Sequence, residues 1–362
     1  MTEDFMPLLG IDHIEFWVGN ARQSAYFYSK AMGFTKSAFA GLETGSRDKM
    51  SFVMSQGGVR FVVTGGLEPD GEIADHVRRH GDGVKAVSLS VPDAEEAWKQ
   101  ATSRGATSVL EPTELADDDG VLRKSGIKAY GDTVHYFIDR SDYRGLYAPG
   151  YKSLKAAPDE TGIQQIDHVV ANVELGKMDE WVKYYEDIFG MTEMIHFTDE
   201  AISTEYSALM SKVCVDGSGR VKLPINEPAD GKRKSQIEEY LDYYGSPGVQ
   251  HIALSTDDIV KTVDALRARG MKFLWVPVTY YAEAIERVGE ITEDYKDLER
   301  LGILVDRDDE GYLLQIFTKN VQDRPTVFFE VIERHGARGF GVGNFKALFE
   351  AIEREQERRG NL

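Results

Sequence analysis

The alternation of apolar and polar positions repeats along the chain in two long segments. GIDHIEFW, from Gly10, and QIDHVVAN, from Gln165, both alternate with the period of two that is typical of a half-buried strand. After each of them, aromatic residues recur at helical spacing until a glycine, Gly33 or Gly190, which favours the end of a helix. Each segment therefore predicts a strand followed by a helix.

A second pair of segments repeats in the same way. GVKAVSLS, from Gly83, is similar to GVQHIALS, from Gly248, and a helical pattern follows both strands. We expect each helix to end at a glycine, and a further strand to follow and stop at a proline. These positions are Gly105 and Pro112 in the first copy and Gly270 and Pro277 in the second.

Four strand–helix–strands modules, two in each half, predict an α+β fold with several curved antiparallel strands. A polar linker that contains Pro and Gly runs over about residues 148–162. We therefore predict two domains, residues 1–150 and residues 151–362. Paired modules of this kind resemble the vicinal oxygen chelate fold. That resemblance implies four βαβββ-type modules in two barrel-like domains, whose curled mixed sheets enclose a metal site.

Three polar side chains interrupt otherwise apolar strand faces in the second half. They are His168 in QIDHVVAN, His251 in GVQHIALS and Glu330 in TVFFEVIE. Either histidine alone is more often a hydrogen-bonded core residue, but a buried carboxylate loses several kcal/mol of hydration unless a cation compensates for it. Two imidazoles and one carboxylate are the facial ligand set of non-haem Fe(II) oxygenases, which leaves positions open for substrate and O₂.

The first half lacks this combination. His13 matches His168, but Ala86 stands where the second half has His251. Around RGLYAPGY, residues 144–151, where we expect the match to the Glu330 segment, there is no glutamate. We therefore interpret His13 as structural and the first half as a non-catalytic copy of the scaffold.

Composition narrows the possible partners. The 362 residues include 42 Lys and Arg and 61 Asp and Glu, so the net charge is −19. This charge disfavours nucleic acid and membrane surfaces as partners, although a local cation can still attract an anionic substrate. Cys214 is the one cysteine and cannot form an internal disulfide. Without a signal peptide or a long apolar run, we expect a cytoplasmic chain.

Two further patterns predict little chemistry. His76 and His80 stand four residues apart in ADHVRRHG, between charged neighbours, and we interpret them as part of a solvated helix face. GFGVGN, residues 339–344, has the glycines of a dinucleotide loop but neither the preceding strand nor a following acidic partner.

From about residue 160 onward, several long segments together carry a specific resemblance. They are KLPINEPADGKRKSQIEEYL, GVQHIAL, LLQIFTK, QDRPTVFFEVIER and GFGVGNFKALFEAIEREQ. The chain here resembles the 4-hydroxyphenylpyruvate dioxygenase family, and the first half matches it more loosely. The resemblance implies conversion of 4-hydroxyphenylpyruvate and O₂ to homogentisate and CO₂ in tyrosine and phenylalanine catabolism. It also implies a homo-oligomer and no requirement for 2-oxoglutarate.

The same resemblance assigns the site residues. It implies that His168, His251 and Glu330 bind Fe(II), and that Gln250, Gln315 and Phe345 take part in catalysis. The residues that it places around the substrate are Ser207, Pro224, Asn226, Gln236, Gln250, Gln315, Phe317, Phe328, Asn344, Phe345 and Leu348. It further implies that the C-terminal helix covers the mouth of the cavity.

Other functions remain open at this point. 4-Hydroxymandelate synthase shares the ligand set and the substrate, but it is associated with an aliphatic residue at the position of Phe345. Extradiol dioxygenases share the fold, although the PINEP and GNF segments do not suggest them. A non-catalytic binding module of this fold would need no complete ligand set.

Overall fold

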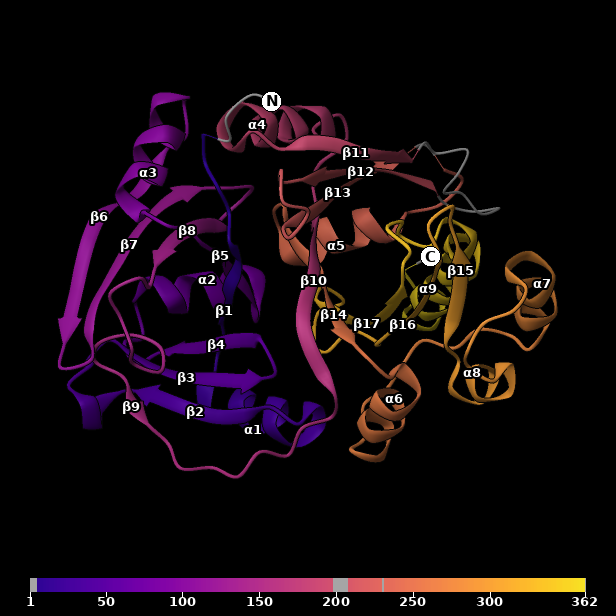
Figure 1. Cartoon of the computed structure of the whole chain (residues 1–362), viewed down its shortest axis with the longest axis horizontal. Coiled ribbons are helices and arrows are strands. Elements are labelled where there is room, and N and C mark those ends of the chain that lie inside the picture. The colour runs from indigo at the N-terminus through magenta and orange to yellow at the C-terminus, as the bar shows by residue number, and fades with distance from the viewer. Residues whose placement is uncertain (1–4, 198–207, 230, 362) are drawn as a thin grey trace.

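The computed structural model of the chain describes residues 5–197, 208–229 and 231–361. Two curved β-sheets lie side by side, and helices pack around them (Figure 1). In order across the first sheet, the strands are β6 (Ser108–Asp117), β7 (Gly120–Lys128), β8 (Val134–Asp139), β5 (Gly83–Ser90), β1 (Gly10–Trp17), β4 (Val59–Gly66), β3 (Lys49–Gln56), β2 (Thr35–Ala40) and β9 (Lys152–Ser153). The second sheet consists of β11 (Thr192–Phe197), β12 (Ala208–Val215), β13 (Lys222–Ala229), β10 (Ile163–Asn172), β14 (Gly248–Thr256), β17 (Phe328–His335), β16 (Tyr312–Phe317) and β15 (Leu304–Arg307).

The helices fall between these strands in a repeating order. They are α1 (Ala21–Met32), α2 (Glu72–His80), α3 (Ala94–Ser103), α4 (Met178–Phe189), α5 (Gln236–Tyr244), α6 (Ile259–Ala268), α7 (Thr279–Val288), α8 (Tyr295–Leu301) and α9 (Phe345–Arg359), with short 3-10 turns η1 (Leu42–Thr44) and η2 (Val342–Asn344). The four βαβββ modules are β1–α1–β2–β3–β4, β5–α3–β6–β7–β8, β10–α4–β11–β12–β13 and β14–α6–β15–β16–β17. The predicted α+β class and its four modules are confirmed.

Strand pairing is duplicated between the sheets. In the first, β1 pairs antiparallel with β5, which pairs parallel with β8; in the second, β10, β14 and β17 are related in the same way. The prediction that a strand ends at each of the two prolines is wrong. Pro112 lies inside the edge strand β6, where a missing N–H faces no partner strand, and Pro277 precedes α7, one of two helices inserted into the fourth module.

The two halves share a continuous core through β17. Phe329 is fully buried, and its ring centroid lies 5.7 Å from that of Phe61 and 6.1 Å from that of Tyr28, both in the first half. Phe16 of β1 completes this cluster at 6.5 Å. Because side chains alternate along a strand, Phe329 faces the first half while its neighbour Glu330 faces the hollow of the second sheet.

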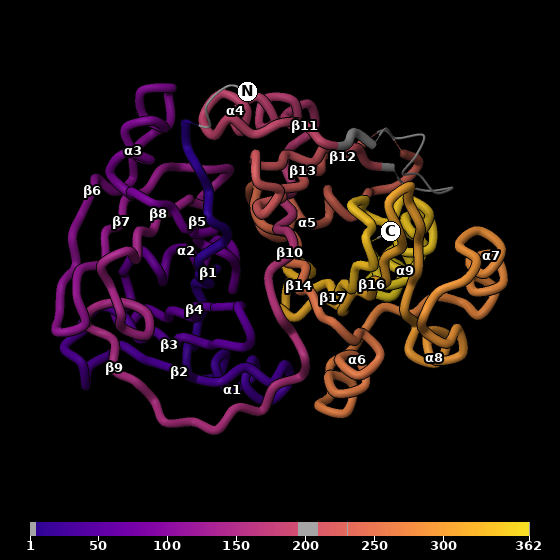
Figure 2. The backbone as a smooth tube through the Cα atoms, in the orientation of Figure 1, coloured from indigo at the N-terminus to yellow at the C-terminus, as the bar shows by residue number. Residues whose placement is uncertain are grey.

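The segment that connects the halves follows β9, which pairs with β2 of the first sheet. Figure 2 shows this segment running along the outside of the first half before it enters β10. Residues 152 and 153 thus still belong to the first sheet, and the domain boundary between residues 150 and 151 stays a prediction. Among the described helices, none combines the length and the apolar character needed to span a bilayer.

The interpretation of His76 and His80 as a solvated helix face is wrong. Both side chains are buried, with 1% and 2% exposed, because α2 packs against the end of α5 from the second half. The His80 ring stacks on that of Tyr244, with centroids 4.5 Å apart. This contact joins residues far apart in the sequence, so the local charge pattern could not indicate it.

Candidate active site

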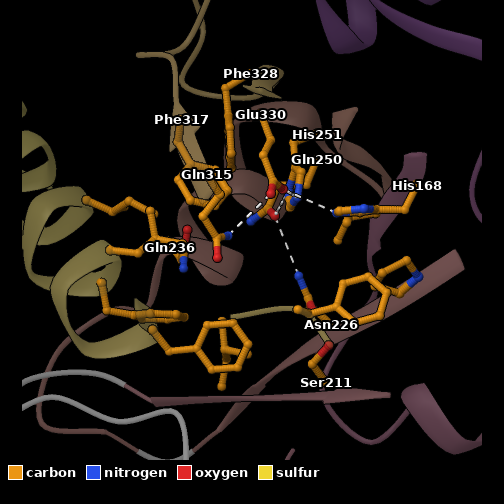
Figure 3. Close-up of a pocket in the computed structure, with 18 of the residues that line it drawn as sticks. His168, Ser211, Asn226, Gln236, Gln250, His251, Gln315, Phe317, Phe328 and Glu330 are labelled. Atoms are coloured by element: carbon orange, nitrogen blue, oxygen red, sulfur yellow. Dashed lines mark hydrogen bonds and ion pairs between the residues drawn. The ribbon is translucent and has the colours of Figure 1, made fainter. Parts of the chain in front are cut away.

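Three adjacent strands of the second sheet bring His168, His251 and Glu330 together, from β10, β14 and β17 respectively. The Nε2 atom of His168 lies 3.2 Å from Glu330 Oε2, and that of His251 lies 3.4 Å from the same oxygen. Figure 3 shows the three side chains pointing toward one another, and their ligand-capable atoms all lie within 4.8 Å of each other.

The other ring nitrogen of each histidine fixes its tautomer. His168 Nδ1 lies 2.8 Å from Asp167 Oδ1, and His251 Nδ1 lies 2.9 Å from Gln250 Oε1. Carboxylate and amide oxygens accept hydrogen bonds, so both Nδ1 atoms donate, and both Nε2 atoms face Glu330. A bare Nε2 lone pair would repel the carboxylate, so a positive charge, either a proton or a metal ion, belongs among these atoms. This donor set therefore fits a divalent metal ion.

Electrostatics at Glu330 agree with that fit. Burial would raise the pKa of the carboxyl, but the neighbouring imidazoles of His168 and His251 lower it to about 2. Burial depresses the pKa of His251, whereas for His168 the adjacent Glu330 and Asp167 outweigh burial and raise the pKa. Glu330 is thus an ionised carboxylate with 2% of its surface exposed, which requires a neighbouring positive charge.

A largely buried ion pair between Arg334 and Asp167 holds the carboxylate that contacts His168. Arg334 donates to Asp167 Oδ2 at 2.8 Å and to Oδ1 at 2.9 Å. Burial would raise the pKa of Asp167, but the hydrogen bonds from His168 and Arg334 hold it well below its usual range. Carboxylate–histidine pairs of this kind orient metal-binding imidazoles.

The first half contains the same aspartate–histidine–arginine arrangement, but not the three candidate metal ligands. Asp12 lies 2.6 Å from His13 Nδ1 and accepts from Arg140, as Asp167 does from Arg334. His13 Nε2, however, is hydrogen-bonded within the protein, at 3.0 Å from Ser88 Oγ and 3.2 Å from Tyr147 Oη.

The first-half counterpart of Glu330 is not in residues 144–151, where we expected it. Val134 pairs with Ala86 as Phe328 pairs with His251, so the position two residues farther along, matching Glu330, is Tyr136 on β8. The sequence alone did not indicate this match because VHY, residues 134–136, and FFE, residues 328–330, share no residue.

A cavity adjoins the three candidate ligands. Its lining comprises His168, Val170, Leu209, Ser211, Val213, Pro224, Asn226, Gln236, Gln250, His251, Gln315, Phe317, Phe328, Glu330, Phe340, Phe345, Leu348, Phe349 and Ile352. Within this described lining there is no Lys or Arg, and Glu330 is the one carboxylate. An anionic substrate would therefore find no cationic side chain on these walls.

Amide side chains form a connected polar wall. Gln315 Nε2 donates to Glu330 Oε1 at 3.2 Å, and Asn344 Nδ2 donates to Gln315 Oε1 at 3.0 Å. On the other side, Asn226 Nδ2 donates weakly to Gln250 Oε1, at 3.5 Å. Asn344 is fully buried behind Gln315 and is not part of the lining, so the structure places it one step away from the cavity.

Aromatic rings form the apolar wall. Phe328 stacks on His251 with centroids 4.8 Å apart, and Phe317 meets the same imidazole edge-on at 6.0 Å. Phe340 packs against His168 at 5.0 Å. Figure 3 shows Phe317 and Phe328 on one side of the candidate ligands and Asn226 with Ser211 on another. A flat ring with a polar end fits such a pocket.

The C-terminal helix α9 closes one side of the cavity. Phe345, Leu348, Phe349 and Ile352 recur at helical spacing on one of its faces, and all four contribute to the lining. Of these, Phe349 and Ile352 were not among the expected substrate contacts, although the same spacing could have indicated them.

Other lining residues also escaped the sequence analysis. Leu209, Ser211 and Val213 alternate along β12, and Ser211 pairs with Asn226 of β13, so the period-two rule applied to β12 would have found them. Val170 lies two residues after His168 on the same face of β10, so the same rule also indicated it, whereas Phe340 carried no such signal. Ser207, one of the expected contacts, lies outside the described residues.

Known proteins resemble this chain over its whole length. The family profile described as hydroxyphenylpyruvate dioxygenase, N-terminal, matches residues 2–152, and the glyoxalase/bleomycin resistance protein/dioxygenase superfamily matches residues 165–316. The 4-hydroxyphenylpyruvate dioxygenase of Dictyostelium discoideum is 48% identical over 98% of this chain and 100% of its own length. That of Yarrowia lipolytica is 46% identical over 100% of this chain and 96% of its own.

A solved structure shows the same architecture. A variant of 4-hydroxymandelate synthase from Streptomyces coelicolor superposes with a TM-score of 0.87 at 34% identity, covering 97% of this chain and 100% of its own. The dioxygenase relatives are more similar in sequence than this synthase. On these grounds, the chain belongs to the 4-hydroxyphenylpyruvate dioxygenase family, within the vicinal oxygen chelate superfamily.

Proposed function

We propose that the chain converts 4-hydroxyphenylpyruvate and O₂ to homogentisate and CO₂, with Fe(II) held by His168, His251 and Glu330. The observation that carries this proposal is the convergence of two imidazole Nε2 atoms on one ionised, buried carboxylate beside an aromatic cavity. When bound, Fe(II) would supply open coordination positions for a 2-oxo acid and O₂, and electrons that activate O₂.

Charge balance supports a metal-bound 2-oxo acid. The substrate brings a carboxylate into a cavity whose described lining holds Glu330 and no Lys or Arg. Two negative charges beside each other in a buried site require about two positive charges, which a divalent ion supplies. Gln250 and Gln315 flank this position and donate or accept without adding charge, so we assign them to orienting the substrate's acid end.

The remaining walls suit the phenol ring. Phe317 and Phe328 offer apolar faces beside the candidate ligands, while the amides of Asn226 and Gln236 can bind a phenol hydroxyl at the far end. Pro224, Phe345 and Leu348 complete the contacts that we expected from the sequence and that line this cavity.

The face of α9 excludes water from the reacting end of the cavity. Phe345, Phe349 and Ile352 place apolar surface over it, and Phe345 and Phe349 also belong to a cluster with Ile237 of α5. A dry site protects reactive oxygen species from side reactions and strengthens polar contacts. We propose that α9 opens to admit substrate and closes during turnover.

Product analysis tests the function directly. Protein loaded with Fe(II) under argon is given 4-hydroxyphenylpyruvate and air, and products are separated by chromatography and identified by mass. We expect homogentisate and CO₂ in about equal amounts, without added 2-oxoglutarate. The His251→Ala variant serves as a control for unbound iron. 4-Hydroxymandelate as the main product would instead establish the activity named for the solved relative, and no product would favour a binding module.

The proposal also includes the setting of the enzyme. Cys214, the single cysteine, is buried, and burial raises the pKa of its thiol to about 12, so it stays protonated and unreactive. We propose a cytoplasmic homo-oligomer, as the family resemblance implies. Light scattering after size exclusion measures the oligomeric state.

A further inference from the structure

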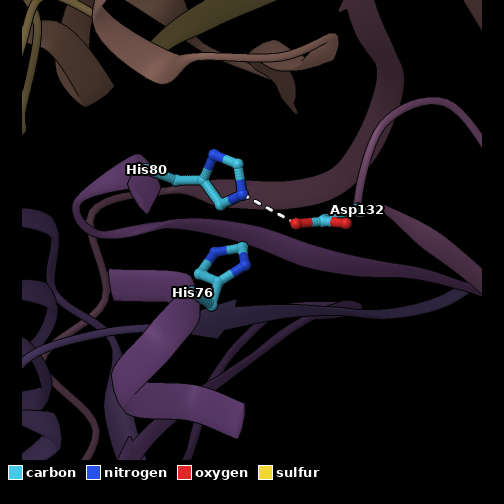
Figure 4. A group of neighbouring side chains, drawn as sticks. All are labelled: His76, His80 and Asp132. Carbon is cyan, nitrogen blue, oxygen red and sulfur yellow. Dashed lines mark hydrogen bonds and ion pairs between the residues drawn. The ribbon is translucent and has the colours of Figure 1, made fainter. Parts of the chain in front are cut away.

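A second group of candidate metal ligands lies in the first half, at its contact with the second. His76 and His80 stand four residues apart on α2, and Asp132 lies in the turn between β7 and β8 (Figure 4). One ligand-capable atom from each of the three lies within 4.8 Å of the others. This cluster shares no residue with the lining of the candidate active site.

His80 already has the hydrogen bond that orients a metal-binding ring. Its Nδ1 lies 2.6 Å from the backbone oxygen of Tyr244, which can only accept, so Nδ1 donates. Its Nε2 lies 2.8 Å from Asp132 Oδ2, which is the distance of a hydrogen bond with a proton between the two atoms. A backbone carbonyl on the far nitrogen is a usual second partner of a metal-binding histidine.

His76 is the residue that the protein alone leaves unexplained. Its side chain is 1% exposed, yet neither ring nitrogen has a hydrogen-bond partner within the described part of the chain. Its ring packs between Trp17, at 5.3 Å, and His80, at 4.7 Å. Unpaired buried nitrogens are rare and costly, and a bound ion or water is a usual partner for them.

Asp132 has one oxygen, Oδ1, that can bind a cation while Oδ2 keeps its contact with Arg79. Arg79 Nη1 and His80 Nε2 both meet the same oxygen, Oδ2, which leaves Oδ1 for another partner. The Asp132 side chain is 35% exposed, so an ion could enter from this side.

We propose that His76, His80 and Asp132 form a second metal site, which takes a divalent transition-metal ion of the Zn²⁺ class. Two histidines four residues apart on a helix, with a carboxylate and one water, supply a tetrahedral set. The ion replaces the proton on His80 Nε2 and gives His76 the partner that it lacks.

The position of this site suggests a structural role. His80 stacks on Tyr244, and the Cβ of any larger residue at Gly83 or Gly248 would lie 2.7 Å or 2.6 Å from the same ring. Tyr244 is thus held tightly between the two sheets at the end of α5, the helix that carries Gln236 into the substrate cavity. A metal ion on His80 would fix the contact between the halves.

Zinc titration of metal-free protein tests the proposal. His251→Ala serves as the background, because it weakens binding at the other candidate site. By calorimetry we expect one equivalent of Zn²⁺ to bind this variant and raise its unfolding temperature. Adding His76→Phe, which keeps a buried ring but removes the ligand atoms, should abolish both effects. In metal-free buffer, the same change should leave the unfolding temperature equal or higher, because it removes an unpaired polar group.

Two further variants guard against misassignment. Asp132→Asn, at a partly exposed turn, should weaken Zn²⁺ binding at least about tenfold and leave the circular dichroism unchanged. His335→Phe should have no effect on binding, although His335 lies beside Glu293 and Glu333 in another cluster. No binding to His251→Ala, retention of Zn²⁺ after His76→Phe, or loss of it after His335→Phe would each overturn the proposal.

Discussion

His13 and His168 occupy matching strand positions and differ in what their Nε2 atoms meet. Ser88 and Tyr147 hydrogen-bond the first, whereas the second faces Glu330 and a cavity. The same imidazole is therefore a satisfied core residue in one half and a candidate ligand in the other. The polar groups around Nε2, and not the strand motif, therefore decide whether the histidine is a core residue or a candidate ligand.

This difference predicts opposite outcomes for matched variants. His168→Ala, His251→Ala or Glu330→Gln should lose bound iron and lower turnover at least about a hundredfold, beyond the roughly 10–100-fold losses caused by residues that only orient ligands. His13→Ala should keep its iron. Metal analysis after gel filtration in iron-containing buffer measures both, and an iron-free His13→Ala beside an iron-loaded His251→Ala would refute the assignment.

Phe345 tests what steers the product. Phe345→Ile keeps the wall of the cavity apolar but removes ring atoms, roughly 1–3 kcal/mol of packing. A barrier difference of about 1.4 kcal/mol changes a product ratio tenfold. We expect the variant to retain iron and O₂ uptake while forming measurable 4-hydroxymandelate beside homogentisate. Chromatography of the products decides, and lower activity with homogentisate alone would mean that Phe345 only anchors α9.

The residues that the sequence could indicate were those whose chemistry conflicts with their local pattern. Glu330 stands out because a carboxylate between Phe328 and Ile332 has no reason to be buried without a cation. His76 does not stand out, because its burial depends on α5 from the other half. Asn344, which we expected to contact the substrate, lies behind Gln315 and does not line the cavity. Sequence spacing does not distinguish a residue that lines a cavity from one that supports the lining.

At the scale of elements, the GFGVGN segment shapes the site through its backbone. Gly341 has φ of 76°, a left-handed conformation that favours glycine, and it lies directly against the side-chain amide of Gln315. A side chain at this position would push Gln315 away from Glu330. The glycines that resemble a dinucleotide loop thus let η2 approach the candidate active site.

Gly341→Ala should therefore damage catalysis more than stability. An alanine in the left-handed region costs about 1–2 kcal/mol, and displacement of Gln315 should lower kcat/KM at least tenfold. Gly360→Ala is the matched control, because Gly360 has φ of 73° and nothing within 4 Å of an added Cβ. Equal activity losses in the two variants would show that backbone strain alone, and not contact with Gln315, explains the effect.

Helices and strands were predictable from the sequence where capping residues and hydrophobic periodicity indicate the same boundaries. Gly33 ends α1 in a left-handed conformation, as we predicted, and Asn20 caps the start of the helix by accepting from Gln23 N at 3.0 Å. The segment after Gly270 was not, because α7 and α8 are an insertion that the first half does not contain. A prediction by internal repeat fails where one copy has gained elements.

At the scale of the whole molecule, β17 connects the substrate cavity to the contact between the halves. Phe329→Ala should lower the free energy of unfolding by about 3–5 kcal/mol, the usual cost of truncating a buried phenylalanine. Phe328→Ala, next to it but facing the cavity, should cost less stability and raise KM more. Denaturant unfolding and steady-state kinetics of the pair measure this contrast, and equal stability losses would contradict it.

The same alternation holds on β1, where Phe16 joins the cluster around Phe329 and Glu15 faces the hollow of the first half. Adjacent positions on one strand thus have different surroundings. Because we predict a non-catalytic first half, we expect inward positions such as Glu15 to tolerate substitution, whereas Phe16 packs on the strand that carries Glu330. In a saturation library scored for homogentisate formation, many residues should be tolerated at position 15 and few at position 16. The first half would then be constrained mainly on the side that packs against the second half.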